Sequence, residues 1–319
     1  VQERKVDRLR ELALKEKIPM VWLLDSAGAR IQELAGSQFA ESGKLFYDQV
    51  KMSGYIPQVA AMMGPCAAGT AYIPALSDFV PMVKGTSSMA LAGPPLVKAG
   101  IGEEITAEEL GGSKIHCEIS GVGDLEVKDD KECLQVVKEY LSYFPSNCEQ
   151  KPPRRGAGGM GSEFDESGDD TVDESILTLL PDSSKKPYDM YKVIEKLVDG
   201  GKLLAIKPNF AKTVITGLAR MGGYPIGIVA NQPMILGGVL DVDSADKAAR
   251  FINLCDAFNV PLLFLQDVPG FMVGSKVERQ GIIRHGAKML YAVSRASVPK
   301  LTIVIRKAYG AGYYVMCGK

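Results

Sequence analysis

Residues 19–28 read PMVWLLDSAG, and residues 261–270 read PLLFLQDVPG. Each stretch contains a proline, a short apolar run, an aspartate and, three residues later, a glycine. A second proline follows each of these prolines by 38 residues and opens another apolar run, PQVAAMMGPCAAG at 57–69 and PKLTIVIRKAYGAG at 299–312. One offset of 242 residues, from 19 to 261, relates all of these positions without a gap. This match indicates an internal repeat.

The repeat predicts secondary structure in both halves. Apolar runs that alternate with helical patterns are typical of buried parallel strands joined by crossover helices. We expect a helix between the two strands of each copy, over 38–51 and 276–296, and further helices over 1–17 and 130–144. The predicted fold class is therefore α/β. Ligands on such folds bind at the carboxyl ends of the strands.

The composition excludes several classes of protein. The chain has 319 residues, 46 % of them hydrophobic, and a net charge of −1 from 37 basic and 38 acidic side chains. This balance is typical of globular proteins and argues against nucleic-acid binding through bulk charge. Prolines and glycines interrupt the longest uncharged run, 52–77, so we expect a strand, a turn and a short helix there and no membrane span. The six cysteines form no CxxC pair, so we expect reduced thiols and no metal site.

The middle of the chain differs from both halves. Residues 163–174 carry seven acidic and no basic side chains. Such a segment cannot bury enough apolar surface to offset its loss of conformational entropy on ordering. We predict a flexible linker over 149–175, a first domain over 1–148 and a second over 176–319. A GxGxxG spacing at 156–161 is assigned to this linker, since no strand precedes it.

Two loops rich in small residues predict chemistry carried by the backbone. AAGTA at 67–71 and GAGYY at 310–314 each follow a predicted strand. Amide N–H groups at the start of a helix have no partner within the helix, and two of them can form an oxyanion hole for a carbonyl oxygen that gains negative charge. The turns at 27–29 and 269–271 can supply companion amides. The alternative is that the glycines only permit close packing, but the same loops at the same spacing in both halves favour function.

Side chains suited to catalysis are scarce. We interpret Asp25 and Asp267 as turn formers at the ends of strands, and Cys66 as a packing residue because its counterpart in the other copy is alanine. His285 is predicted to lie on a helix and His116 in a short polar strand, each as a packing or hydrogen-bonding residue. No GxSxG, HExxH or SxxK motif is present, which disfavours the hydrolases that use them.

Longer motifs resemble one family, the β subunits of biotin-dependent acyl-CoA carboxylases of the propionyl-CoA and methylcrotonyl-CoA type. The first half resembles them through LDSAGARIQE, GPCAAGTAYIPALSDF, GPPLVKAGIGEEITAEELGG and SGVGD. The second half resembles them through the stretches at 231–274 and 284–319. The resemblance implies two crotonase-like (ClpP/crotonase) domains with a ββα repeat, both incomplete in this chain. It also implies that this subunit moves the carboxyl group of carboxybiotin to the α or vinylogous carbon of an acyl-CoA.

The resemblance assigns roles to nine residues. Two pairs of small residues are implied as the catalytic backbone amides, the first for the thioester oxygen of acyl-CoA and the second for the ureido oxygen of biotin: Ala68 with Gly69, and Ala311 with Gly312. Five further residues are implied in substrate binding, the last of them in the choice of acyl chain: Gly28, Ala29, Gly270, Phe271 and Tyr314.

Partners and a location are also implied. The chain contains no biotin-acceptor sequence and no biotin carboxylase segment, so we expect carboxybiotin on a partner subunit. We expect a homo-oligomer with a dimer core, commonly a hexamer, in the bacterial cytoplasm or the mitochondrial matrix. Its active site is expected to join the first domain of one subunit to the second domain of another. The preferred acyl group stays open. The alternatives are a subunit of a sodium-pumping acyl-CoA decarboxylase and a catalytically silent scaffold.

Overall fold

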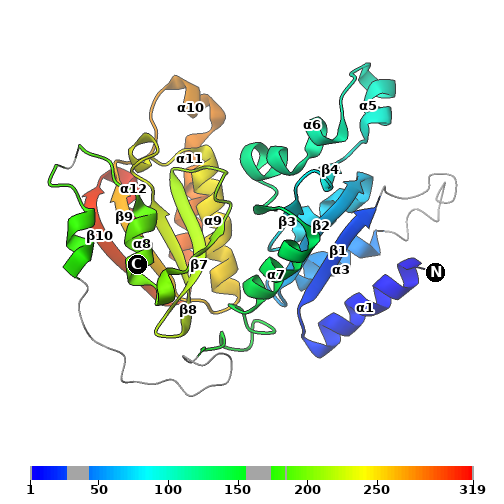
Figure 1. Ribbon diagram of the computed structural model, residues 1–319, viewed down its shortest axis with the longest axis horizontal. Helices are drawn as coiled ribbons and strands as arrows, with labels where there is room; N and C mark the ends of the chain where they lie inside the picture. Colours follow the sequence, from blue (N-terminus) through cyan, green and yellow to red (C-terminus); the bar gives the residue numbers. More distant parts are fainter. Residues whose placement is uncertain (1, 27–42, 156–173, 184, 318–319) are drawn as a thin grey trace. The chain divides into compact units, whose positions relative to one another are not determined.

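The structure, a computed structural model, describes residues 2–26, 43–155, 174–183 and 185–317 of the chain. They form two compact units (Figure 1). Unit 1 contains Val1–Leu141 and Ser146–Gln150, and unit 2 contains Ser142–Pro145 and Lys151–Lys319. Most of the predicted linker, 156–173, lies outside the described residues, so its flexibility stays a prediction.

Unit 1 is built on a parallel sheet, as the repeat predicts. Its strands lie in the order β1-β2-β3-β5, with β4 paired to β2, and every pairing is parallel. Parallel strands are buried by the helices of their crossovers, and seven of the ten residues of β2 are buried. The strands are β1 (Met20–Ser26), β2 (Gln58–Ala67), β3 (Pro81–Val83), β4 (Ser88–Ala90) and β5 (Leu125–Val127).

The helices of unit 1 cover this sheet (Figure 1). On α7 (Asp130–Leu141), Tyr140 stacks on Phe79 with ring centroids 4.3 Å apart, both fully buried. A buried hydrophobic cluster of unit 1 includes Met52, Ile56 and Met62. The remaining helical segments are α1 (Gln2–Glu16), α3 (Lys44–Met52), η2 (Ala68–Ala71), α4 (Tyr72–Leu76), α5 (Pro94–Ile101), α6 (Ala107–Gly111) and η3 (Ile115–Ser120).

Unit 2 has a mixed sheet in the order β10-β9-β8-β7-β6. The pairings β10–β9 and β9–β8 are parallel, and β8–β7 and β7–β6 are antiparallel. All seven residues of β9 are buried, as expected for a central parallel strand. The strands are β6 (Leu204–Ile206), β7 (Val214–Met221), β8 (Tyr224–Asn231), β9 (Leu262–Val268) and β10 (Lys300–Ala308).

Helices on both sides of the repeat strands complete unit 2. The longest, α9 (Val242–Ala257), packs against α11 (Ile282–Arg295). It begins with a capping box between Asp241 and Ser244, which satisfies backbone N–H groups at its start. The remaining helical segments are η4 (Glu174–Leu179), α8 (Met190–Leu197), η5 (Asp199–Gly201), η6 (Leu236–Gly238), α10 (Ser275–Gln280) and α12 (Gly310–Val315).

The internal repeat is confirmed at the level of strand register. In unit 1, Met20 pairs with Gln58 and the register shifts before Ser26 pairs with Cys66. In unit 2, Leu262 pairs with Lys300 and the register shifts before Val268 pairs with Ala308. Each pair in unit 2 lies 242 residues after its counterpart in unit 1. The two copies therefore share even the irregularity that precedes the small-residue loops.

Three local predictions need correction. The helix expected over 276–296 is broken into α10 and α11 at Gly281, whose φ of 87° lies in the left-handed region that favours glycine. His116 lies in the π-helix η3 and not in a strand, because its ring binds the Met89 carbonyl and the Ser120 hydroxyl, each at 2.7 Å. The helix expected over 130–144 ends at Leu141.

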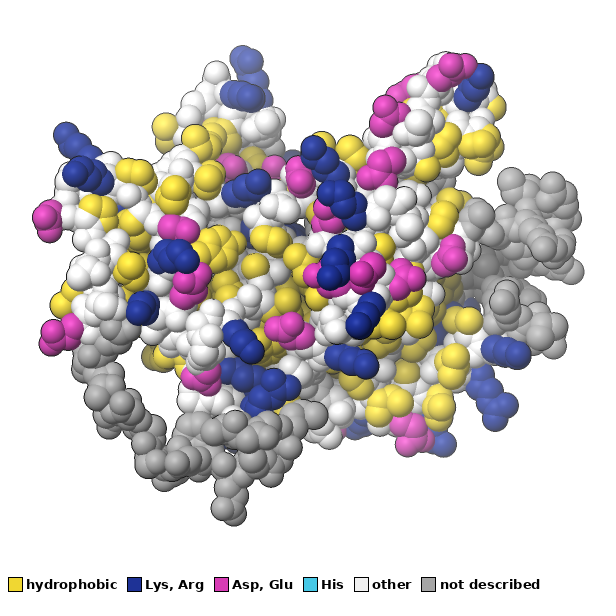
Figure 2. Space-filling model, in the orientation of Figure 1, with side chains coloured by type: hydrophobic (Ala, Val, Ile, Leu, Met, Phe, Trp, Pro, Cys, Tyr) yellow, Lys and Arg dark blue, Asp and Glu magenta, His cyan; other side chains and the backbone are white. Residues whose placement is uncertain are grey.

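The distribution of charged side chains on the surface is consistent with the near-zero net charge of the sequence (Figure 2). On the face shown in Figure 2, basic and acidic side chains are interspersed over the described residues. Within the same ranges no helix is long and apolar enough to cross a membrane.

Candidate active site

The short helices after β2 and β10 begin in the same unusual conformation. Ala68, the first residue of η2, has φ 58°, and Gly310, the first residue of α12, also has φ 58°. These residues are related by the 242-residue offset. An alanine in the left-handed region is uncommon and is strained by about 1–3 kcal/mol. The same backbone geometry is therefore built into both copies, in one of them at a cost.

The amides at the start of both short helices are open to solvent. Ala68 and Gly69 are exposed, as are Gly310 and Ala311, and no side chain caps either helix. The first N–H groups of a helix have no acceptor within it. Each copy thus has two adjacent exposed residues with backbone N–H donors at the carboxyl end of a strand, a position where such donors can form an oxyanion hole.

Gly312 has a different environment from the other three predicted loop residues. It is buried, and a Cβ added to it would lie 3.0 Å from Val268 Cγ2 and 3.1 Å from Gly270 Cα. The glycine therefore allows α12 to pack closely on the end of β9. The residues related by the repeat to Ala68 and Gly69 are Gly310 and Ala311, one position before the pair predicted from the sequence.

The companion residues are partly described. Gly270, with φ 123°, lies next to Gly312, and its carbonyl accepts a hydrogen bond from the Leu240 N–H at 3.1 Å. The ring of Phe271 packs against Gly286, where an added Cβ would be 3.1 Å from it. Tyr314 is exposed, and its ring meets that of Tyr313 edge to face at 5.5 Å.

Two predicted substrate-binding residues, Gly28 and Ala29, lie outside the described residues. Their predicted role is therefore not located in the structure.

An apolar cavity of about 420 Å³ lies beside the first loop. Its walls come from the end of β2, from β4, and from α5 and α6. Ala68 contributes to the lining, and no charged side chain does. Such a cavity suits an uncharged acyl or thioester group. The lining residues are Pro65, Cys66, Ala67, Ala68, Ser88, Ala90, Leu91, Gly93, Pro94, Pro95, Leu96, Ala107 and Leu110.

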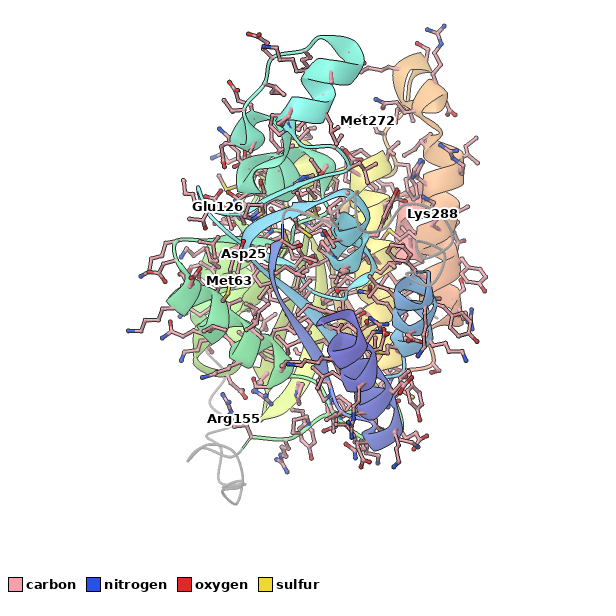
Figure 3. All side chains as sticks on the ribbon, turned by 90° about the vertical axis from the view of Figure 1, so that its right-hand side faces the viewer. Asp25, Met63, Glu126, Arg155, Met272 and Lys288 are labelled. Carbon is pink, nitrogen blue, oxygen red and sulfur yellow. The ribbon has the colours of Figure 1, made fainter. Side chains whose placement is uncertain are left out.

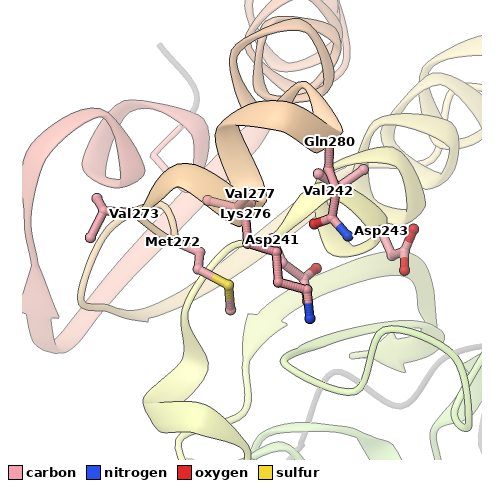
Figure 4. Close-up of a pocket in the computed structure, with 8 residues that line it drawn as sticks. All are labelled: Asp241, Val242, Asp243, Met272, Val273, Lys276, Val277 and Gln280. Carbon is pink, nitrogen blue, oxygen red and sulfur yellow. The ribbon is translucent and has the colours of Figure 1, made fainter.

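A second cavity, of about 670 Å³, lies in unit 2 and is more polar (Figure 4). It is bounded by the start of α9, by α10 and by Met272 and Val273, which follow Phe271. Burial, together with the Asp241 and Asp246 carboxylates, raises the pKa of Asp243 at its edge. None of the seven predicted site residues that the structure describes lines this cavity.

The two aspartates of the repeat are not turn formers. Asp25 and Asp267 both lie inside strands, β1 and β9. The Asp25 carboxylate lies over Gly64 of β2, where an added Cβ would be 2.3 Å from Oδ1; Figure 3 labels Asp25. Asp267 is fully buried and pairs with Arg306, with Nε 2.9 Å from Oδ2. A buried carboxylate requires such a partner, which the strand pattern alone did not reveal.

Both histidines form hydrogen bonds that fix their rings, as predicted for packing or hydrogen-bonding residues. His285 lies on α11, as predicted, and its Nδ1 is 2.7 Å from Asp246 Oδ2. The Lys288 ammonium shares that oxygen at 3.0 Å. Neither His285 nor His116 lines one of the two cavities. In the part of the chain that the structure describes, no three His, Cys, Asp or Glu side chains group as a metal site would require.

We expect Cys66 to react slowly with thiol reagents. Burial raises the pKa of its thiol, against a smaller lowering by Thr70. The reactive thiolate is therefore scarce at neutral pH. At pH 7.5 the folded full-length protein should incorporate iodoacetamide at Cys66 much more slowly than at the partly exposed Cys148, and the rate at Cys66 should rise only at alkaline pH. Peptide mass mapping measures both rates, and fast labelling of Cys66 at neutral pH would restore it as a candidate nucleophile.

Comparison with known proteins identifies the family. The family model described as the carboxyl transferase domain matches residues 1–319. The α subunit of methylmalonyl-CoA decarboxylase from Veillonella parvula is 45 % identical over 317 residues, which are 99 % of this chain and 60 % of that protein. The biotin-dependent acetyl-/propionyl-coenzyme A carboxylase β5 subunit from Mycobacterium tuberculosis is 44 % identical over 319 residues, which are 100 % of this chain and 58 % of that protein.

A solved structure shows the same fold. The transcarboxylase 12S subunit, crystallised as a hexamer with hydrolysed methylmalonyl-coenzyme A bound, has a TM-score of 0.92 and 43 % sequence identity. The match covers 99 % of this chain and 60 % of that one. The chain thus spans about 60 % of the length of the relatives it matches. The α/β class predicted from the repeat and the crotonase-like fold implied by the family resemblance are confirmed, and the chain belongs to the carboxyl transferase domain family.

Proposed function

We propose that this chain is the carboxyltransferase part of a biotin-dependent acyl-CoA carboxylase. The observation that carries the proposal is the pair of exposed, left-handed loop starts at Ala68 and Gly310, which the repeat places at equivalent strand ends. One hole suits a thioester oxygen and the other a ureido oxygen, and both oxygens gain negative charge during carboxyl transfer. A silent scaffold would have no reason to keep a strained alanine at Ala68.

The residues of this chain act through their backbone. The N–H groups of Ala68 and Gly69 donate to the thioester oxygen of an acyl-CoA whose acyl group enters the apolar cavity of unit 1. Their dipoles stabilise the enolate that remains when the α proton leaves. The N–H groups of Gly310 and Ala311 donate to the ureido oxygen of biotin. Carboxybiotin, delivered by a partner subunit, would supply the carboxyl group that replaces the α proton, and the ureido nitrogen that loses the carboxyl group would take up that proton.

The substrate side chain is proposed to meet the aromatic residues after the second hole. The family resemblance assigns acyl choice to Tyr314, two positions beyond the pair Ala311 and Gly312. Counted from Gly310 and Ala311, the same position is Tyr313. Both rings are exposed in the described residues. A ring here would limit the length of the acyl chain.

The assembly is proposed by analogy with its relatives. The transcarboxylase 12S structure is a hexamer. We propose a homo-oligomer in which the first domain of one subunit and the second domain of another form each active site, with a partner that carries biotin and biotin carboxylase. A cytoplasmic or mitochondrial location stays a prediction.

The same chemistry in the reverse direction is the second candidate. The relative from Veillonella parvula is a methylmalonyl-CoA decarboxylase subunit. In that case the carboxyl group would move from the CoA ester to biotin. Proteins that copurify with the full-length protein distinguish the two: a biotin carboxylase subunit supports the first candidate, and a membrane-embedded subunit supports the second.

One assay tests carboxyl transfer itself. The full-length protein is mixed with methylmalonyl-CoA and free biotin, and conversion to propionyl-CoA is followed by chromatography. We expect turnover that depends on biotin and saturates with the CoA ester. Absence of any biotin-dependent turnover with acetyl-, propionyl- and methylcrotonyl-derived carboxylated esters would contradict the proposed function.

A further inference from the structure

The repeat contains one aspartate at equivalent positions in its two copies, Asp25 and Asp267, and their environments differ. Asp25 in unit 1 is exposed, whereas Asp267 in unit 2 is fully buried. The cause lies on the neighbouring strand. The 242-residue offset places Arg306 where unit 1 has Gly64, which has no side chain. It places Lys307 where unit 1 has Pro65, which has no N–H. Only the aspartate of unit 2 therefore has both partners opposite it.

Arg306 and Lys307 lie in the bulge of β10 that precedes the second loop, and both bind Asp267. Between the pairs Val304–Gln266 and Ala308–Val268 the register shifts, so three residues of β10 face Asp267 alone. Asp267 Oδ2 accepts from Arg306 Nε at 2.9 Å. Oδ1 accepts from the Lys307 N–H at 3.0 Å. The carboxylate thus binds the backbone and the side chain of the bulged segment at once, which holds its shape.

The residues beside Asp267 extend this support to the loop. Gln266 Nε2 donates to the Tyr313 carbonyl at 3.2 Å. The Tyr309 N–H donates to the Val268 carbonyl at 3.2 Å. Three consecutive residues at the end of β9 therefore hold the chain before and after the second loop, at Tyr309 and Tyr313.

The guanidinium of Arg306 connects this support to a third segment. Nη1 donates to the carbonyls of Ser183 and Lys186 at 3.3 and 3.0 Å. Its Cζ lies 4.5 Å from the centroid of the Tyr188 ring, and the side chain is only 11 % exposed. Loss of one member of a buried ion pair leaves an uncompensated charge, so the pair maintains one arrangement of these segments.

We propose that Asp267 and Arg306 are positioning residues for the second oxyanion hole, at Gly310 and Ala311. The inference rests on the proposed carboxyl transfer. The pair does not touch substrate; it fixes the path of the backbone that does. A displacement of about 1 Å in a positioned group can cost up to about a hundredfold in rate.

The kinetic test uses variants that keep shape. Asp267→Asn retains an acceptor for the Lys307 N–H but loses the charge that faces Arg306. In the methylmalonyl-CoA and biotin assay we expect kcat to fall by about tenfold. The KM for the CoA ester should change less than kcat, since the thioester and the cavity for the acyl group are proposed to lie in unit 1 and only the rings of Tyr313 and Tyr314 belong to unit 2. Arg306→Met should behave alike, Arg306→Lys should retain more activity, and the double variant should be no slower than the slower single variant.

The matched control is Asp256 of α9, which binds the chain just before β10 begins, at the end of that strand opposite to Arg306. Asp256 Oδ1 accepts from the Ser297 and Val298 N–H groups at 2.6 and 3.2 Å, just before β10 begins. Asp256→Asn should lower the thermal midpoint and leave kcat within twofold. A folded Asp267→Asn protein with full kcat, or an equal loss of kcat in Asp256→Asn, would overturn the proposal.

A second measurement does not depend on activity. Hydrogen exchange of the Lys307 and Tyr309 amides, which donate to Asp267 and to Val268, should be about tenfold faster in Asp267→Asn than in the wild-type protein and unchanged in Asp256→Asn. If the wild-type protein shows no carboxyl transfer, the proposed function fails while this measurement still tests the positioning. Equal exchange in all three proteins would refute the positioning itself.

Discussion

Gly310→Val should lower the rate of carboxyl transfer by about 10²–10³-fold, the scale for losing one oxyanion-hole donor, about 2.7–4 kcal/mol. Gly310 has φ 58°, and nothing lies within 4 Å of a Cβ added to it. Space is therefore not the obstacle. A β-branched side chain strongly disfavours this backbone region, so the amides of Gly310 and Ala311 would turn away from the oxygen they bind. Steady-state kinetics with methylmalonyl-CoA and biotin measure the loss.

Two control variants distinguish loss of the oxyanion-hole amides from the general effect of backbone strain. Gly310→Ala should retain most of the activity, because Ala68 holds the same φ in the other copy. Gly200→Val introduces the same strain elsewhere: Gly200 is exposed in η5, has φ 59° and also has open space at its Cβ. It should leave kcat unchanged. If Gly310→Val were fully active with a native thermal midpoint, the backbone-amide mechanism would be wrong.

Lys247→Met should lower the free energy of unfolding of unit 2 by about 3 kcal/mol. Lys247 is only 4 % exposed. Its ammonium donates to the carbonyls of Lys207, Phe210 and Val214 at 2.8, 2.8 and 2.7 Å. Methionine has similar length but no donor, so these carbonyls would lose a charged partner. The thermal midpoint should fall by about 6–12 °C.

The control for this prediction is an exposed lysine of the same unit. Lys202→Met, between η5 and β6, should change the midpoint by less than about 2 °C, since surface substitutions change stability by about 0.5 kcal/mol or less. Calorimetry or circular dichroism records both midpoints. An equal midpoint for Lys247→Met and the wild-type protein would show that the carbonyls find other donors and that the ammonium does not organise the 207–214 loop.

The strands were readable from the sequence because their signals are local. Leu23 and Leu265 each lie in an apolar run that a proline precedes and an aspartate follows. The structure places both runs in strands with the same register to their partners, at Ala61 and Ile303. The inner strands β2 and β9 are largely buried, whereas residues such as Leu23 on β1 and Leu301 on β10 are exposed, so the expectation of burial was wrong for these two strands. The gapless repeat in sequence is nevertheless a gapless repeat in pairing.

Features that depend on the φ angle of a single residue could not be predicted from the sequence. The break at Gly281 lies inside an amphipathic pattern that continues on both sides of it. The second loop contains two glycines, Gly310 and Gly312, and the family resemblance assigns the latter, with Ala311, to the catalytic pair. The structure distinguishes them: Gly310 is exposed with a positive φ, and Gly312 is buried against Val268. A glycine needed for a positive φ and a glycine needed for close packing cannot be told apart in the sequence.

By itself the sequence determined the fold class, the two repeat copies and the strand ends at which the small-residue loops lie. The periodicity of apolar residues and the turn residues is encoded along the chain, so distance in sequence suffices to detect it. Tertiary structure alone decided that Asp267 is a buried ion-pair partner of Arg306 while Asp25 is exposed, and that Gly310 begins the second loop in the conformation of Ala68. These facts depend on which side chains meet across neighbouring strands after the register shifts, and a strand pattern contains no information about its bulges.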